Sequence, residues 1–288
     1  MNKKSLFSAG NTALITGAAL GIGRSAAAYC ASQGMHVCMV DVLADDLEDA
    51  AKEARDAAKE NGQTDNKILS SAMDVSDQND WQSLHQQISQ EFGDLNLLMN
   101  NAVTRIGRGF DASREEWRQA FETNFWGIVT AVDLFLPQLK NASGTSAIVN
   151  VGSKQGITNP PGHPIYNIAK SAIKTYSEQL EHALRNADDA DNSNAQSVTT
   201  HLLVPGWTTT GRAEHKPGAW LPAQVVERMV QAVDNGDFYV ICPDGECSES
   251  MDKKRIQWGA GDITENRPPL SRWHQGFKSE ASATCDSD

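Results

Sequence analysis

Residues 12–23 have the sequence TALITGAALGIG, in which an apolar run is followed at once by the glycines Gly17, Gly21 and Gly23. The apolar run at 12–16 predicts a buried strand, and the pattern after it predicts a helix. Glycines between a strand and a helix permit a tight turn and let backbone N–H groups approach a pyrophosphate. The stretch, which includes Ile22, therefore predicts a dinucleotide site, although the same glycines would also suit a simple turn.

The rest of the chain repeats this alternation of short apolar runs and longer helical patterns. We predict further strands at 36–40, 68–73, 95–99, 147–151, 197–204 and 238–241, and helices at 23–33, 45–61, 77–91, 113–140, 166–187 and 222–233. Helices of this length between strands are typical of right-handed crossovers in a parallel sheet. The predicted fold class is α/β: a doubly wound parallel sheet of about seven strands with helices on both faces.

The predicted domain organisation is one α/β domain over 1–245, an extension over 246–278 and a disordered tail over 279–288. The tail is expected to be disordered because its residues have almost no apolar content. The acidic segment 188–196 predicts a surface loop. Four larger apolar residues before the tail indicate that the extension packs on a neighbouring subunit or over the mouth of the site: Trp258, Leu270, Trp273 and Phe277.

Composition limits the possible partners. The chain has 288 residues and a net charge of −12, which argues against nucleic-acid binding because phosphates require a concentrated basic surface. Its 5 cysteines show neither a Cys-x-x-Cys pair nor a zinc-like His spacing, so we expect reduced thiols and no metal. No apolar run approaches the ~20 residues that span a bilayer, and the apolar stretch after Lys4 is too interrupted for a secretion signal. We expect a cytoplasmic protein with no membrane partner.

Asp41 follows the second predicted strand and bears on the choice of cofactor. A carboxylate at this point can accept hydrogen bonds from both ribose hydroxyls of NAD and would repel the extra phosphate of NADP. The loop residues between Gly17 and Gly21 offer no base for that phosphate, and only Arg24 is near. NAD is therefore favoured over NADP, while a turn-forming role for Asp41 stays open.

Tyr166 and Lys170 are four residues apart, a spacing that places them on one face of a helix, and Ser153 precedes them. A tyrosine titrates near ~10, so a general acid or base tyrosine needs a neighbouring cation to lower its pKa. Lys170 could supply that charge, and the Ser153 hydroxyl could hold a carbonyl or alcohol oxygen of a small-molecule substrate. On spacing alone, an ordinary helix face is the commoner explanation for a Tyr and a Lys four residues apart.

Taken in order, these motifs resemble the short-chain dehydrogenase/reductase family over residues 11–241. The resemblance rests on the glycine loop and on Asp74-Val75, Asn100-Asn101-Ala102, Asn124, Ser153, Tyr166-x-x-x-Lys170 and Pro205-Gly206. It implies a Rossmann fold and reversible hydride transfer between a nicotinamide and a secondary alcohol or ketone.

The resemblance also implies residue roles. Tyr166 would be the acid/base, Lys170 would lower its pKa and bind the nicotinamide ribose, and Ser153 would position the substrate oxygen. Asn124 would hold a water that links Lys170 to solvent. The other implied cofactor contacts are Asp74, Val75, Asn101, Pro205, Gly206, Thr208 and Thr210.

Two positions depart from the family pattern. Val103 stands where a glycine usually follows Asn-Asn-Ala, which puts a β-branched side chain close to the expected cofactor path. Thr208 replaces an isoleucine after Pro-Gly, whereas Thr210 keeps the final threonine.

Residues 207–222 lie where the family has a mobile substrate lid. Trp207 and Trp220 are candidates to enclose an apolar substrate, or they simply pack the loop. A second hypothesis is that three cationic side chains attract a carboxylate or phosphate: Arg212, His215 and Lys216. His163 is a further candidate for substrate contact, although a loop histidine without a partner is more often uninvolved.

The predicted helices 113–140 and 166–187 carry more apolar residues than one sheet face requires. These are Trp117, Phe121, Phe125, Trp126, Phe135, Ile173 and Tyr176. With the family likeness they predict the seam of a homodimer or homotetramer.

Two other functions compete with a dehydrogenase. A non-catalytic NAD sensor would use the fold only for binding, but would be expected to have lost Tyr166 or Lys170. An epimerase-type relative would use the same pair on a sugar nucleotide, but needs a larger substrate domain than the residues after Ile241 provide.

Overall fold

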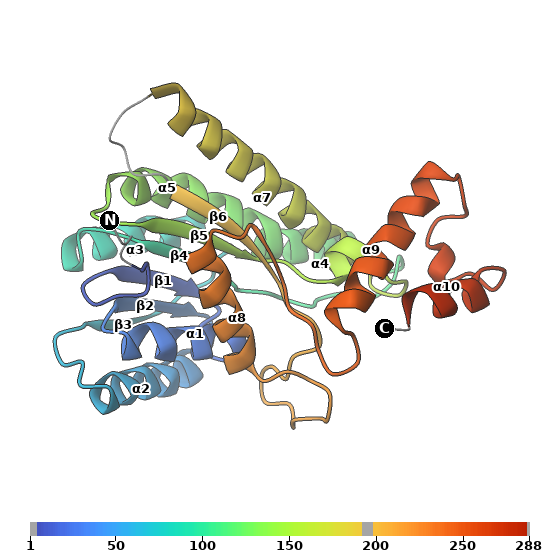
Figure 1. Cartoon of the computed structure of the whole chain (residues 1–288). Helices are drawn as coiled ribbons and strands as arrows, with labels where there is room; N and C mark the ends of the chain where they lie inside the picture. Colours follow the sequence, from blue (N-terminus) through green and yellow to red (C-terminus); the bar gives the residue numbers. More distant parts are fainter. Residues whose placement is uncertain (1–4, 192–197, 287–288) are drawn as a thin grey trace.

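A sheet of parallel strands forms the centre of the molecule (Figure 1), and the computed structural model describes residues 5–191 and 198–286. The strands are β1 (Thr12–Thr16), β2 (His36–Asp41), β3 (Ile68–Ala72), β4 (Leu97–Asn100), β5 (Ser146–Val151), β6 (Val198–Val204) and β7 (Tyr239–Ile241). They form a 7-stranded sheet in the order β3-β2-β1-β4-β5-β6-β7. The strand order reverses between β1 and β4, and in such sheets ligands bind outside the carboxyl ends of the strands at that point. The predicted doubly wound fold is confirmed.

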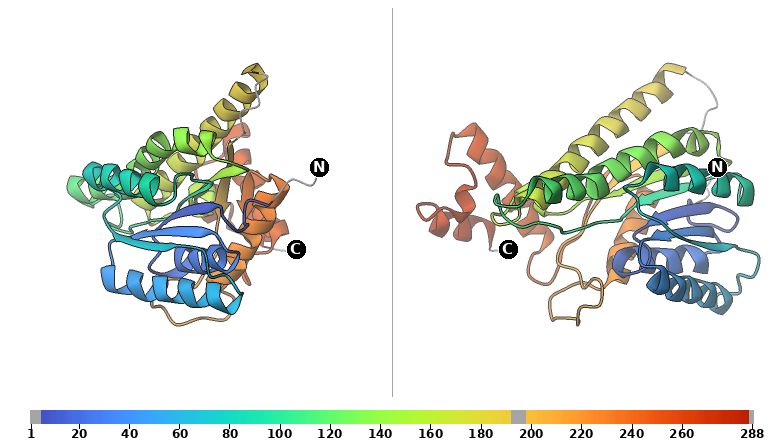
Figure 2. Two further views of the ribbon diagram at one scale, coloured as in Figure 1. Left: turned by 90° about the vertical axis from the view of Figure 1, so that its left-hand side faces the viewer. Right: turned by 180° about the vertical axis from the view of Figure 1, so that it is seen from behind.

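Helices cover both faces of the sheet (Figures 1 and 2). One face carries α1 (Gly21–Ser32), α2 (Ala44–Glu60) and α8 (Pro222–Asn235), and the other carries α3 (Gln78–Glu91), α5 (Gly127–Asn141) and α7 (Pro164–Asp191). Successive strand residues face opposite sides. In β1, Ile15 joins the core beneath α1, whereas Leu14 joins the core that includes Trp81 of α3 and Phe135 of α5.

The single helix predicted at 113–140 is divided into three parts. It consists of α4 (Arg114–Phe121), the π-helical turn η1 (Glu122–Trp126) and α5. A capping box starts α4, because the Glu116 N–H donates to Ser113 Oγ at 3.2 Å and the Ser113 N–H donates to Glu116 Oε2 at 2.7 Å. A π turn inside a helix is common at functional sites, and this one contains Asn124.

Helix α7 runs beyond its predicted end. It continues to Asp191, so the surface loop predicted at 188–196 is wrong for its first residues, and 192–196 lie outside the described residues. The helical pattern that carries Tyr166 simply extends into the acidic segment. Across the described parts of the chain, no helix is both long and apolar enough to cross a membrane.

The C-terminal extension is folded, and so is most of the tail that follows it. It contains α9 (Glu249–Thr264), η2 (Ser271–Trp273) and α10 (Lys278–Cys285), and it projects away from the sheet (Figure 1). The disorder predicted over 279–288 is therefore wrong for the residues up to 286, and 287–288 lie outside the described part. The reason is that Ala281 and Cys285, although small, pack on Trp258, and Asp286 pairs with two arginines of the extension.

Candidate active site

The glycine loop between β1 and α1 is held in a compact shape. Gly17 and Gly21 have positive φ angles of 65° and 56°, a backbone region that side chains rarely adopt. A Cβ on Gly23 would lie 2.2 Å from the carbonyl oxygen of Gly17. Asn101, after β4, secures the loop from below, since its Nδ2 donates to the carbonyl oxygens of Thr16 at 2.9 Å and Gly17 at 3.0 Å. The glycines give the loop a backbone shape that other residues rarely adopt, directly before a helix. The backbone N–H groups at such a helix start suit a pyrophosphate.

The Asp41 carboxylate stands beside this loop at the end of β2. Its Oδ2 accepts the N–H of Ala19 at 3.1 Å, and its Oδ1 accepts the N–H of Leu43 at 3.1 Å. Each oxygen keeps a lone pair for a further donor such as a ribose hydroxyl. The cations nearby are already paired, Arg24 with Glu53 at 2.7 Å and Arg212 with Asp46 at 2.6 Å.

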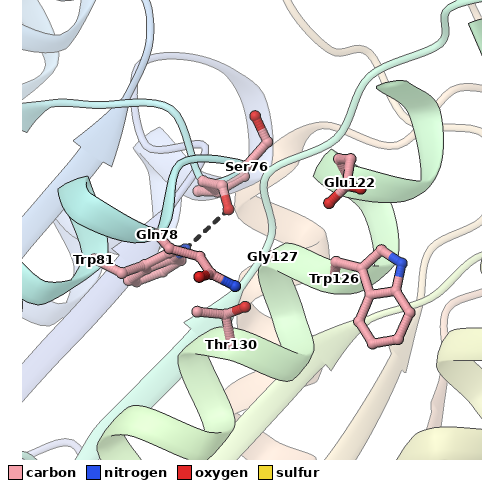
Figure 3. A pocket seen from close by; sticks show the side chains of 8 residues that line it. Ser76, Gln78, Trp81, Glu122, Trp126, Gly127 and Thr130 are labelled. Atoms are coloured by element: carbon pink, nitrogen blue, oxygen red, sulfur yellow. Dashed lines mark hydrogen bonds between the residues drawn. The ribbon is translucent and has the colours of Figure 1, made fainter. Parts of the chain in front are cut away.

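Asp74 and Val75 follow β3. The Asp74 carboxylate accepts the N–H of Ser76 at 2.9 Å, and the carbonyl oxygen of Val75 accepts the indole N–H of Trp81 at 2.9 Å (Figure 3). Val75 is buried against the start of α5. The pocket drawn in Figure 3 lies here and contains none of the predicted catalytic residues; Val75, Ser76, Gln78, Trp81, Glu122, Trp126, Gly127 and Thr130 line it.

Ser153, Tyr166 and Lys170 meet at the carboxyl end of β5. Ser153 follows the strand directly, and Tyr166 and Lys170 lie in the first turns of α7. The Lys170 ammonium is buried, donates to the carbonyl oxygen of Val151 at 2.7 Å and lies 5.8 Å from the centre of the Tyr166 ring. Gly156 permits this packing, because a Cβ there would lie 2.6 Å from the Lys170 backbone.

The electrostatics of this group favour a tyrosinate. Burial by itself raises the pKa of Tyr166, but the Lys170 ammonium, a hydrogen bond with Ser153 and the Arg105 guanidinium outweigh it, and the pKa falls below its ordinary value. Burial also lowers the pKa of Lys170, which the charge of Tyr166 opposes. A tyrosine with a lowered pKa can give and take a proton at a substrate oxygen nearer to neutral pH than a free phenol can.

Asn124 holds the loop after β4 by two hydrogen bonds. Its Oδ1 accepts the Thr104 N–H at 2.8 Å, and its Nδ2 donates to the Thr104 carbonyl oxygen at 2.9 Å. The side chain is buried within the π turn. In this structure the amide of Asn124 therefore fixes the backbone next to Arg105, in addition to the water-binding role that the resemblance implies.

The chain is similar to proteins of one known family. The family model described as short chain dehydrogenase matches residues 11–217. The chain belongs to the short-chain dehydrogenase/reductase family. It is 30% identical over 213 residues to the NADP-dependent (R)-specific alcohol dehydrogenase of Lentilactobacillus kefiri. The matched segment covers 73% of this chain and 78% of that protein. It is 27% identical over 235 residues to the 3-oxoacyl-[acyl-carrier-protein] reductase FabG of Thermotoga maritima, covering 80% of this chain and 85% of the reductase.

A solved structure of this family is also similar. It is the short-chain dehydrogenase/reductase of Burkholderia phymatum in complex with NAD, with a TM-score of 0.78 and 26% identity, covering 92% of this chain and 98% of the other. The chain is thus an oxidoreductase of this family, and a nicotinamide dinucleotide fits the loop that its glycines form.

In this short-chain dehydrogenase/reductase the segment 207–222, which is the predicted lid, approaches the glycine loop. The Thr210 side chain lies close to Gly21: a Cβ added to Gly21 would be 3.4 Å from it. Thr208 forms an isolated parallel bridge with Trp220, whose side chain packs against the core beneath α1 and α8. Trp207 is 38% exposed.

The three lid cations predicted to attract an anion differ in their surroundings. Arg212 is committed to Asp46 on α2, and the His215 ring is hydrogen-bonded to Thr209 Oγ1 at 2.9 Å. Lys216 is exposed. His163 lies in the connection before α7, where its backbone carbonyl accepts the Asn167 N–H at 3.0 Å.

Pro205 and Gly206 follow β6, where the lid begins. A Cβ on Gly206 would lie 2.4 Å from Asp244 Oδ2 and 2.9 Å from Lys154 Nζ, so the glycine leaves room for that ion pair. Val103, at the position of the usual family glycine, is 49% exposed.

Arg105 is the site residue that the sequence motifs did not single out. Its guanidinium carbon lies 5.1 Å from the centre of the Tyr166 ring, and it hydrogen-bonds to that side chain. The sequence does place it three residues after Asn100-Asn101-Ala102, in the loop that follows β4 at the edge of the sheet where ligands bind.

Proposed function

We propose that the protein is an NAD-dependent oxidoreductase that interconverts a secondary alcohol and a ketone. The observation that supports this most directly is the Tyr166 hydroxyl, with its lowered pKa, beside Ser153 and the buried Lys170 ammonium. The nicotinamide cofactor, when bound, supplies or accepts the hydride. The chain's own residues bind the substrate oxygen and move its proton.

Tyr166 is the proposed acid and base. In alcohol oxidation the tyrosinate takes the hydroxyl proton, and in ketone reduction the tyrosine donates a proton to the carbonyl oxygen. Lys170 stabilises the tyrosinate by its charge, and its hydrogen bond to Val151 holds the ammonium in place. Ser153 donates a hydrogen bond that orients the substrate oxygen toward Tyr166.

NAD is the proposed cofactor because of the charges around the adenosine end of the expected site. Asp41 ends β2, and Asp45 and Asp46 lie in the first turn of α2. Asp41 and Asp45 would repel a 2′-phosphate, whereas Arg24 is paired with Glu53 and Arg212 with Asp46. The NAD complex of the Burkholderia phymatum protein supports this choice, while the Lentilactobacillus kefiri enzyme is NADP-dependent.

A homodimer or homotetramer is the proposed assembly. Most of the residues predicted for the seam are taken up by the core: Phe135 and Ile173 are buried, and Phe125 and Tyr176 pack against them. Trp126, at 50% exposure, and Ile168, at 44%, remain apolar and accessible on η1 and α7. These two side chains mark the proposed contact between subunits.

The test is NADH formation with a panel of secondary alcohols, followed by the reverse reaction with the matching ketones. Tyr166→Phe should lower kcat by roughly 100-fold or more, since a positioned acid/base contributes about that much. Tyr176→Phe is the matched control, because it removes a hydroxyl from the same helix outside the site and should keep near-normal activity.

The same assay separates the competing functions. An NAD sensor would bind NAD without producing NADH, and an epimerase-type enzyme would give no net NADH. A Tyr166→Phe variant that retains most of its activity would remove the proposed mechanism.

A further inference from the structure

We propose that Arg105 is a specificity residue that binds a carboxylate of the substrate, one or two carbons from the reacting carbon. This inference rests on the proposed alcohol and ketone chemistry and adds the class of substrate: short hydroxy acids and the corresponding oxo acids.

The Arg105 guanidinium borders the place where substrate must react. Its carbon is 5.1 Å from the centre of the Tyr166 ring, and the side chain is exposed, so a ligand reaches it from solvent. The hydroxyl of Tyr166 must touch the substrate oxygen to exchange a proton with it. A group that hydrogen-bonds to the same tyrosine is therefore within a few ångströms of the substrate's neighbouring carbons.

The loop that carries Arg105 is anchored on both sides. Before it, Thr104 is held by both of its backbone groups on the buried Asn124 side chain. After it, Gly107 has a φ of 70°, and a Cβ there would lie 2.8 Å from the side chain of Ile165 at the start of α7. Arg105 is thus presented by fixed backbone, and less ordering is needed when a ligand binds.

The charge of Arg105 is not neutralised by a carboxylate in residues 5–191 and 198–286. No ion pair to it occurs there, whereas Arg212 on the lid is paired with Asp46. A guanidinium offers five N–H donors in a planar fork that matches a carboxylate. In a chain with a net charge of −12, a free cation beside the catalytic tyrosine is a local feature that selects for an anion.

The test compares acids with their neutral esters. NADH formation is measured with 2-hydroxybutyrate and 3-hydroxybutyrate and with the methyl ester of each, for the wild type, Arg105→Gln and Arg105→Lys. Arg185→Gln is the charge-matched control, since Arg185 is exposed, pairs with Glu181 and lies far along α7 from Tyr166.

We expect the wild type to favour at least one acid over its ester in kcat/KM. Arg105→Gln should lower that acid-to-ester ratio about tenfold or more, because a hydrogen bond to a charged group is worth about that factor. Arg105→Lys should restore part of it, and Arg185→Gln should leave it unchanged. The thermal unfolding midpoint reports whether each variant is folded, because the loss of Arg105 also removes a contribution to the lowered pKa of Tyr166 and so affects the turnover of acid and ester alike.

An equal ratio in the wild type and in Arg105→Gln would overturn the inference, as would a wild type that oxidises only the esters. In both cases the proposed dehydrogenase function stands. If neither the acids, the esters nor neutral secondary alcohols yield NADH, the proposed function fails and this inference fails with it.

Discussion

Lys154, which follows β5, forms an ion pair with the C-terminal extension. Replacing Lys154 with methionine should destabilise the protein. Its Nζ lies 2.7 Å from Asp252 and 3.2 Å from Asp244. All three side chains are shielded from solvent: Lys154 is 17% exposed, Asp252 is 5% exposed and Asp244 is 6% exposed. Asp252 belongs to α9, and Asp244 also accepts the backbone N–H of Trp207 at the start of the lid.

The expected magnitude follows from this burial. Methionine keeps most of the volume of lysine but leaves two shielded carboxylates without their ion-pair partner. Breaking a buried ion pair in this way costs roughly 3–5 kcal/mol. For a domain of this size each kcal/mol corresponds to about 2–4 °C in Tm. The expected decrease in Tm is therefore roughly 6–20 °C.

Differential scanning calorimetry at neutral pH measures the change. Lys52→Met is the control, because Lys52 is 75% exposed and its pair with Asp56, a surface contact, contributes about 0.5 kcal/mol or less. The double variant Lys154→Met/Asp252→Asn should recover part of the loss, since it removes one of the unpaired charges. A Tm of Lys154→Met equal to that of Lys52→Met would refute the reasoning.

Four further predictions concern the site and the assembly. Asp41→Asn should raise the ratio of kcat/KM for NADP to kcat/KM for NAD by about tenfold, because the repulsion of the 2′-phosphate is reduced. Steady-state kinetics with both cofactors measures this ratio. An unchanged ratio would contradict the proposed role of Asp41. For alcohol oxidation, kcat/KM should rise with pH and then level off, because Tyr166 must be deprotonated to take the proton. The apparent pKa of this rise should lie below the ~10 of free tyrosine. For ketone reduction, kcat/KM should fall with pH through the same range. Lys170→Met should move that limb to higher pH, and a limb that stays in place would mean that Lys170 does not set it. Trp126→Lys should weaken subunit association about tenfold or more, because it places a charge in an apolar contact. Light scattering over a dilution series measures the mass of the assembly. A variant with the same mass as the wild type at every dilution would mean that the contact lies elsewhere.

The strands and the glycine loop could be predicted closely because they depend on local rules. The strand predicted at 12–16 is β1 (Thr12–Thr16), and the helix predicted at 222–233 begins as predicted and ends two residues later as α8. Alternating apolar residues, glycines and a proline at the first helical position are signals that reside in neighbouring residues.

The extension could not be predicted in the same way. Its burial uses small residues such as Ala281 and Cys285, and its last turn is held by ion pairs from Asp286 to Arg255 and Arg272. Neither produces a strong apolar pattern. The π turn at Asn124 is equally hidden, because its neighbours form an ordinary helical pattern on both sides.

The order of motifs in the chain already specified the family, the sheet and the pairing of Tyr166 with Lys170, because a spacing of four on a helix fixes which side chains are neighbours. The placement of Arg105 beside Tyr166, and of Lys154 between two carboxylates, required the folded chain. These contacts join residues on different elements, and their geometry depends on how loops leave the sheet and on which helix packs beside them. Local periodicity carries no record of that, whereas the tertiary structure brings the side chains within a few ångströms of each other.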